Sequence, residues 1–273
     1  MDEDIARSKK ETLVRNLKEL SSLLVAFSGG VDSTFLLAIA HQTLGNNVIA
    51  ATASSIAHPS SERKEADEFT RQRGIRHIIF ESDETSLPEF LSNSPDRCYH
   101  CKKSLSKSLI KIAKDRGIRY VAHAINTDDL RDYRPGIKAA KEMGIISPLV
   151  AAQLNKDEIR FLSKDMGLFT WDKPSMACLA SRIPYGSPIT VEKLKMVEEA
   201  ERFLAEKGFK QRRVRHHGSI ARIEVPPSDI PRITEEGLRK DVVRRFREIG
   251  FNHIAVDLEG YRSGSMNRDL NNR

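Results

Sequence analysis

A glycine-rich segment, Ser28-Gly29-Gly30-Val31-Asp32-Ser33-Thr34, directly follows a short apolar run and carries the strongest chemical pattern in the chain. Glycines let the backbone turn tightly and bring its N–H groups close to a ligand. If a helix begins here, its first N–H groups are unpaired and its positive dipole end favours an anion. We therefore predict a site for a phosphate or pyrophosphate, with contacts from Ser28, Gly29, Gly30, Ser33 and Thr34. Asp32 suits the first turn of the helix or a Mg²⁺ ion.

This segment lacks the Gly-Lys-Ser/Thr ending of a Walker A loop and the spacing of a dinucleotide fingerprint. An ordinary strand–helix turn is the plain alternative. Two polar positions fit the same site, because ligands of parallel sheets bind at the carboxyl ends of the strands. They are Ser54, at the end of a predicted strand, and Asp128, in the loop after another strand.

Three cysteines form the second pattern. Cys98 and Cys101 make a C-x-x-C pair, and Cys178 lies 77 residues further on. A zinc site commonly needs four ligands, and the sequence has no second pair. A thioredoxin-like redox pair would lie at a helix start, where the flanking sequence does not place it. Three thiolates suit a [4Fe–4S] cluster with one open iron. Alternatively, Cys178 acts alone as a nucleophile activated by Arg182 or Lys173, or all three thiols are idle.

The hydrophobic periodicity predicts the elements that position these residues. Strands are predicted over 22–27, 47–54, 77–80 and 120–124, and helices over 4–20, 31–44, 60–73, 105–116, 136–142 and 157–166. This alternation predicts an α/β domain with a parallel sheet and helices on both faces. Beyond residue 186, helices over 190–207 and 241–249 and strands over 211–217, 221–225 and 253–257 predict a small α+β domain. We therefore divide the chain into domains 1–185 and 186–273.

The composition limits the classes of protein to consider. With 273 residues, 39% hydrophobic and 30% charged, the chain is expected to be globular, neither disordered nor fibrous. The longest uncharged apolar stretch, near residues 50–57, is too short to cross a bilayer, and the acidic N-terminus does not resemble a secretory signal. We expect a cytoplasmic protein with no membrane partner.

The net charge of +7 suits an anionic ligand, either a small phosphate compound or RNA. Aromatic residues make up only 6% of the chain and are not interspersed among clustered basic residues, so we expect no nucleic-acid partner. Arg213 and Arg215 lie two apart in a predicted strand and therefore face the same side. Paired guanidiniums suit a phosphate monoester or a carboxylate. A solvated strand face is the alternative.

Segment 28–34 resembles the PP-loop, SGGxDS, of the ATP pyrophosphatases, which cleave ATP between its α and β phosphates. Further motifs make the chain similar to the LarE family of ATP-dependent sulfur transferases of nickel-pincer cofactor synthesis, from about Leu13 to Asn267. These motifs occupy residues 132–136, 178–186, 213–218, 221–225 and 260–262. One departure is the loop Ala124–Asp129, whose Ala-Ile-Asn replaces the family's Gly-Thr-Asn.

The resemblance implies that ATP adenylates a carboxylate of pyridinium-3,5-biscarboxylic acid mononucleotide, and that sulfur then displaces AMP to leave a thiocarboxylate. Some members sacrifice one cysteine, at the position of Cys178. Others hold a [4Fe–4S] cluster on three cysteines, whose open iron presents hydrosulfide. Because this chain has all three, the resemblance implies the cluster type, with Cys98, Cys101 and Cys178 as ligands. The implied substrate-binding residues are Arg182, Arg213, Arg215 and Glu224.

The implied cofactors are ATP, Mg²⁺ and the cluster, and the implied partners are a sulfide source and further copies in a homo-oligomer such as a hexamer. Three alternatives stay open. A PP-loop tRNA thiolase also pairs this loop with C-x-x-C and a third cysteine. An ammonia-using synthetase of the same superfamily would not need the cysteines. A nucleotide-binding module would use the loop without catalysis.

Overall fold

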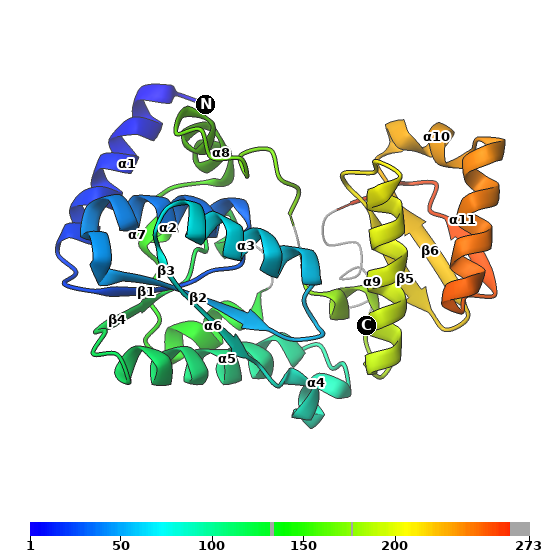
Figure 1. Ribbon diagram of the computed structural model, residues 1–273, viewed down its shortest axis with the longest axis horizontal. Coiled ribbons are helices and arrows are strands. Elements are labelled where there is room, and N and C mark those ends of the chain that lie inside the picture. The colour runs from blue at the N-terminus through cyan, green and yellow to red at the C-terminus, as the bar shows by residue number, and fades with distance from the viewer. Residues whose placement is uncertain (132–133, 176, 263–273) are drawn as a thin grey trace. The chain divides into compact units, whose positions relative to one another are not determined.

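The computed structural model describes residues 1–131, 134–175 and 177–262, drawn in colour in Figure 1. The chain divides into two compact units. The first comprises Met1–Glu84 and Cys98–Met176, and the second comprises Thr85–Arg97 and Ala177–Arg273. Asp132 and Tyr133 of the motif at 132–136 lie outside the described residues.

A four-stranded parallel sheet, in the order β3-β2-β1-β4, forms the centre of the first unit. Its strands are β1 (Leu23–Ala26), β2 (Val48–Ser54), β3 (Arg76–Glu81) and β4 (Tyr120–Ala122). The chain runs outward from β1 to β3 and then returns to β4 on the other side of β1. The order therefore reverses between β1 and β4, and open α/β sheets bind ligands at this switch point, beside the carboxyl ends of the strands.

Helices cover both faces of this sheet, as Figure 1 shows for α2 and α3 on one side and α5 and α6 on the other. The helices are α1 (Glu3–Lys18), α2 (Val31–Leu44), α3 (Ser60–Gln72), α5 (Arg97–Lys114), α6 (Pro135–Glu142), α7 (Pro148–Ala151) and α8 (Lys156–Asp165), with short 3-10 turns at Gly45–Asn47 and Asp128–Arg131. Strand residues alternate between the two cores: Leu23 and Val25 pack with α1 and α2, whereas Leu24 packs with α5. This alternation is the period of two that a sheet buried on both faces requires.

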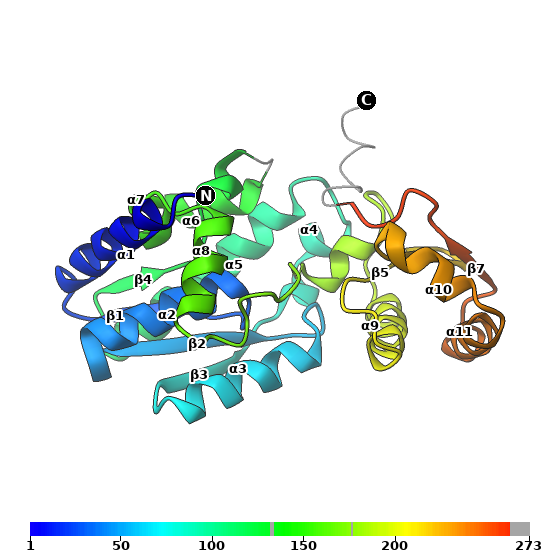
Figure 2. The same ribbon diagram turned by 90° about the horizontal axis from the view of Figure 1, so that it is seen from above.

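The second unit is a smaller α+β assembly, seen from above in Figure 2. Its sheet has the order β5-β6-β7, antiparallel between β5 and β6 and parallel between β6 and β7. The elements are β5 (Arg213–His217), β6 (Ile220–Glu224), β7 (His253–Val256), α4 (Pro88–Leu91), α9 (Val191–Glu206), α10 (Ile230–Thr234) and α11 (Glu236–Ile249), with 3-10 turns at Glu84–Ser86, Leu179–Arg182 and Pro227–Asp229. Buried side chains of α9, α11 and the sheet form its core.

The predicted α/β class with a parallel sheet is confirmed, but two local features differ from the sequence analysis. Helix α5 begins at Arg97 rather than at residue 105, so the C-x-x-C pair does lie at a helix start, and the contrary expectation was wrong. The reason is that residues 97–104 are mostly polar and show no apolar period. Within the described residues, no helix has the length and apolar character needed to cross a membrane.

The contacts also assign residues 85–97 and 177–185 to the second unit, whereas the sequence places the boundary at residue 186. Asn93 explains this assignment. Its buried amide donates to the carbonyl oxygens of Ile183, Pro184 and Ser187, at 3.2, 2.7 and 2.9 Å. Arg97 donates in turn to Asn93 Oδ1. One side chain therefore binds together segments about ninety residues apart, which no local sequence pattern reveals.

His123 makes the stability of the first unit depend on pH. It follows β4, and its Nε2 lies 2.7 Å from Ser147 Oγ. Burial, assisted by the positive charge of Lys102, lowers the pKa of His123 from 6.5 to about 4. Below pH 6.5 the unfolded chain therefore binds a proton that the folded chain does not, and folding loses free energy as the pH falls towards 4.

We predict that this one group reduces the free energy of unfolding by about 3 kcal/mol between pH 8 and pH 4. Urea unfolding at several pH values measures the loss in the wild type and in His123→Gln. The variant should show a correspondingly shallower decline. Equal declines in both proteins would contradict the prediction.

Candidate functional site

The PP-loop joins β1 to α2 at the carboxyl edge of the parallel sheet. Gly29 has a φ of +69°, a left-handed backbone conformation that residues with a side chain rarely adopt, so glycine fits here without strain. Gly30 caps α2 without a side-chain hydrogen bond to the helix. The first N–H groups of this 14-residue helix therefore receive no hydrogen bond from a capping side chain at Gly30, and the binding of an anion to them stays a prediction.

The hydroxyl groups of the loop have different surroundings. Ser28 is exposed, its Oγ lies 3.0 Å from Ser33 Oγ, and it accepts the Gly30 N–H at 3.4 Å. Ser33 is buried, and its hydroxyl donates to Gly30 O at 3.3 Å. Thr34 is fully buried, and its N–H bonds to Gly30 O. Ser28 therefore offers the accessible hydroxyl, while Ser33 stabilises the turn; direct contacts of either residue with ATP stay predictions.

The loop after β4 is held against the start of α2. Asn126 Oδ1 accepts the N–H groups of Asp128 and Asp129, at 2.9 and 3.3 Å, and Asn126 Nδ2 donates to Asp32 Oδ1 at 3.3 Å. Lys156 completes the link: its Nζ lies 2.5 Å from Asp32 Oδ2, and its N–H donates to Asp128 Oδ2 at 2.8 Å. Asn126 thus makes these contacts beside Ala124 and Ile125, the two positions that depart from the resembled motif.

The carboxylates of this loop do not form a resident Mg²⁺ site. Aspartate oxygens have the right chemistry, but the ammonium of Lys156 already neutralises Asp32, and Asp129 pairs with Arg134 at 2.6 Å. In the part of the chain that the structure describes, no three His, Cys, Asp or Glu side chains gather as a metal-ligand set. Asp32 as a Mg²⁺ ligand therefore does not fit this arrangement, and we derive no step through that ion.

The sequence analysis did not predict that two lysines, Lys156 and Lys173, lie near the glycine-rich loop. Lys156 is the first residue of α8, and the only signal for its position was the Asn155–Glu158 capping box that begins the helix. Lys173 donates to Gly29 O at 3.0 Å and to Glu65 Oε2 at 2.6 Å. Ser54 ends β2 as expected, and its Oγ accepts from Arg63 at 3.0 Å.

Cys98 and Cys101 lie at the start of α5, three residues apart and thus on neighbouring positions of one helix face. Gly136 lets α6 approach this turn, because a Cβ there would lie 2.7 Å from Lys102 Cγ and 3.3 Å from Cys98 O. Both thiols are partly exposed. Their donor chemistry suits an iron–sulfur cluster, but Cys178 belongs to the other unit, so the set of three ligands stays a prediction.

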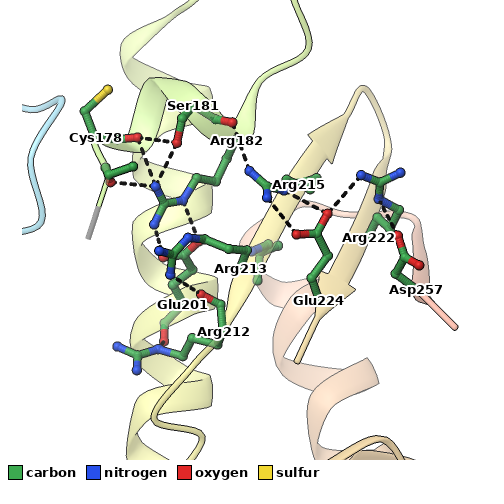
Figure 3. Close-up of polar contacts among 12 residues, drawn as sticks. Cys178, Ser181, Arg182, Glu201, Arg212, Arg213, Arg215, Arg222, Glu224 and Asp257 are labelled. Atoms are coloured by element: carbon green, nitrogen blue, oxygen red, sulfur yellow. Dashed lines mark hydrogen bonds and ion pairs between the residues drawn. The ribbon is translucent and has the colours of Figure 1, made fainter. Parts of the chain in front are cut away.

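In the second unit, a buried arginine holds the backbone on either side of Cys178. Arg182 is fully buried and donates to Ala177 O at 2.6 Å and to Cys178 O at 3.0 Å. Its other nitrogens form a two-pronged pair with Glu201 of α9, at 2.8 and 2.9 Å (Figure 3). These contacts hold the Cys178 loop in place, and a direct contact of Arg182 with substrate, which the resemblance implies, stays a prediction.

Glu201 connects this loop to the sheet. Burial alone would raise its pKa, but the charge and hydrogen bonds of Arg182, together with the charge of Arg213, outweigh burial and lower it. The carboxylate is therefore ionised, and it also accepts the Val214 N–H of β5 at 3.0 Å.

Arg213 and Arg215 are both buried in β5, in contrast to the solvated strand face that was the alternative. Arg215 forms a two-pronged pair with the buried Glu224, at 3.0 and 2.7 Å, and donates to Ser181 O at 3.0 Å. Glu224 also accepts from Arg222 at 3.0 Å. Arg213 lies over the Tyr261 ring at 5.2 Å, and burial together with repulsion from Arg182 lowers its pKa to about 10.

Positive charge exceeds negative charge in this group of described side chains (Figure 3). The arginines are Arg182, Arg212, Arg213, Arg215 and Arg222, and the carboxylates are Glu201, Glu224 and Asp257. Guanidinium groups bind phosphate and carboxylate oxygens through charge-assisted hydrogen bonds, so such a group suits an anionic ligand. A phosphate or carboxylate beside Arg213 would oppose the lowering of its pKa.

Comparison with known proteins agrees with this site chemistry. Residues 1–88 match the PP-loop domain family. The chain is 44% identical over 263 residues to an uncharacterised protein of Synechocystis sp., which covers 96% of this chain and 98% of that protein. It is 38% identical over 265 residues to the pyridinium-3,5-bisthiocarboxylic acid mononucleotide synthase of Lactiplantibacillus plantarum. That alignment covers 96% of this chain and 95% of the synthase. A tRNA-specific 2-thiouridylase of Rickettsia felis is 27% identical over 191 residues, in an alignment that covers 56% of this chain and 52% of the thiouridylase.

The Arg182–Glu201 pair yields a direct stability prediction. Arg182→Met leaves Glu201 buried without its main partner, so we expect a loss of about 3–5 kcal/mol in the free energy of unfolding. Adding Glu201→Gln should restore part of this loss, because the buried charge is then removed. The matched control is Arg202→Gln, whose exposed pair with Glu206 at 3.9 Å should contribute less than about 0.5 kcal/mol. Urea denaturation of the variants makes the comparison, and equal losses for Arg182→Met and Arg202→Gln would refute it.

Proposed function

The chain belongs to the LarE family of PP-loop, ATP-dependent sulfur transferases, and on that premise we propose that it converts the carboxylates of pyridinium-3,5-biscarboxylic acid mononucleotide to thiocarboxylates. The observation that carries the proposal is the 38% identity, over 96% of the chain, to a synthase of the bisthiocarboxylic acid mononucleotide. The PP-loop and the arginine group supply anion-binding chemistry that this reaction needs.

The proposed first step is adenylation. A carboxylate oxygen of the substrate attacks the α-phosphorus of ATP, and the bond from that phosphorus to the β-phosphate oxygen breaks. The leaving pyrophosphate carries the electron pair and is held by the free N–H groups at the start of α2 and by the Ser28 hydroxyl. Lys156 keeps Asp32 neutralised beside these phosphates.

The proposed second step is sulfur transfer. A sulfur nucleophile attacks the acyl carbon of the adenylate, the bond from that carbon to the phosphate oxygen breaks, and AMP leaves. We assign Cys178 as the residue that presents sulfur, on the loop that Arg182 holds in place. If Cys178 itself provides the atom, its Cβ–Sγ bond breaks after loss of the α-proton, and dehydroalanine remains in the chain.

We further propose that Cys98, Cys101 and Cys178 can hold a [4Fe–4S] cluster, with Cys178 retained as a ligand. When bound, such a cluster supplies hydrosulfide at its open iron, which would allow repeated turnover. We propose that the arginine group binds the anionic substrate: Arg213 and Arg215 would bind its phosphate or second carboxylate, and Glu224 would keep Arg215 in place.

Anaerobically prepared protein, with ATP, the mononucleotide and sulfide, tests the proposal. We expect pyrophosphate and AMP only when the mononucleotide is present, together with a product in which sulfur replaces oxygen, detected by mass spectrometry. Cys178→Ala should release pyrophosphate but form no thiocarboxylate. Pyrophosphate release that depends on tRNA instead of the mononucleotide would favour the thiolase alternative and overturn the proposal.

The variant Cys98→Ser/Cys101→Ser separates the two sulfur sources. If a cluster is used, the wild type binds about four irons per chain and turns over repeatedly, and the double variant loses both properties. If Cys178 is sacrificed, the wild type stops after one turnover, its Cys178 becomes dehydroalanine, and the double variant behaves identically.

A further inference from the structure

Lys173 contacts the PP-loop although no motif marks it. Its Nζ donates to the carbonyl oxygen of Gly29 at 3.0 Å and to Glu65 Oε2 of α3 at 2.6 Å, and its side chain is only 15% exposed. The ammonium thus holds one particular peptide group of the loop, the one between Gly29 and Gly30.

This peptide group has two possible orientations with opposite consequences for an anion. A trans peptide is planar, so its C=O and N–H point in opposite directions. Because neither Gly29 nor Gly30 has a Cβ, rotating the peptide between them meets little steric resistance. One orientation offers the Gly30 N–H to a phosphate, and the other presents the Gly29 carbonyl oxygen, which would repel it.

The observed orientation is the one that accepts an anion. Lys173 lies on the carbonyl side, so the Gly30 N–H points away from the ammonium and donates to the exposed Ser28 hydroxyl at 3.4 Å. A phosphate can take the place of this long hydrogen bond. The contact with Lys173 opposes rotation of the peptide, since rotation would leave the ammonium without its carbonyl partner.

Lys173 is itself held in place by its surroundings. Arg160 of α8 donates to Lys173 O at 2.8 Å and to Trp171 O at 2.6 Å, which fixes the backbone of this segment. Glu65 fixes the other end of the side chain and balances its charge. Helices α3 and α8 therefore hold Lys173, and Lys173 in turn holds the Gly29 carbonyl group.

We propose that Lys173 is a positioning residue that sets the Gly29–Gly30 peptide in the orientation that binds the phosphates of ATP. The inference rests on the proposed use of ATP at this loop. It assigns Lys173 a role through the backbone of the loop, distinct from the activation of Cys178 considered from the sequence.

Calorimetric binding of inorganic pyrophosphate and ATP, without the mononucleotide, tests this inference in the full-length chain. Lys173→Met should weaken both ligands about tenfold or more, whereas adenosine binding should not change. Lys173→Arg, which keeps a donor, should recover part of the affinity. The control is Lys164→Met, whose ammonium lies over the Trp171 ring at 4.8 Å.

The ¹⁵N–¹H signals of Gly29 and Gly30 in ligand-free protein separate positioning from direct contact. We expect them to shift in Lys173→Met and to stay in place in Lys164→Met. Unchanged pyrophosphate affinity in Lys173→Met would overturn the inference, and so would weakened affinity with unmoved glycine signals, because the ammonium would then act on the phosphate directly. A wild type that binds neither ATP nor pyrophosphate would instead contradict the proposed function.

Discussion

The first unit depends on one constraint: backbone N–H groups must face an anion at the point where the strand order reverses between β1 and β4. A turn that exposes its N–H groups lacks the internal hydrogen bonds that would stabilise it, so neighbouring side chains must supply them. Ser33, in the first turn of α2, donates to the carbonyl oxygen of Gly30, and Lys173 donates to that of Gly29. Asn126, in the loop after β4, donates to the carboxylate of Asp32. The contacts around the loop are therefore best understood as supports for a turn that is left open to a ligand.

The second unit buries several positively charged side chains. Arginines taken out of water need carboxylate partners or they destabilise the fold. Glu201 pairs with Arg182, and Glu224 pairs with Arg215. Arg182 also donates to the carbonyl oxygens of residues 177 and 178, and Arg215 donates to that of residue 181. The same ion pairs thus bury the arginines and shape the loop that carries Cys178. The several guanidinium groups that gather here give this unit the chemistry to contact an anionic ligand.

Regular patterns in the sequence predicted the sheet, its helices and the glycine-rich turn, because these depend on local periodicity and on residues next to one another. Contacts between segments that are distant in the sequence produce no local pattern of this kind. Helix α5 extends through polar residues around Cys98, Asn93 joins segments about ninety residues apart, and Lys173 lies outside any motif. Arg182 was recognised as important, but its complete burial against Glu201 gives it a supporting position that sequence spacing alone does not distinguish from a ligand-binding one.

Adenylation of the substrate carboxylate is the proposed chemical step on which this account rests. It is tested most directly with mononucleotide whose carboxylates carry ¹⁸O, incubated with the protein, ATP and sulfide, followed by mass spectrometry of the products. Attack on the α-phosphorus predicts that one ¹⁸O atom passes into AMP for each thiocarboxylate formed. Unlabelled AMP, or label appearing in inorganic phosphate, would contradict the account, because the carboxylate would then be activated by another route.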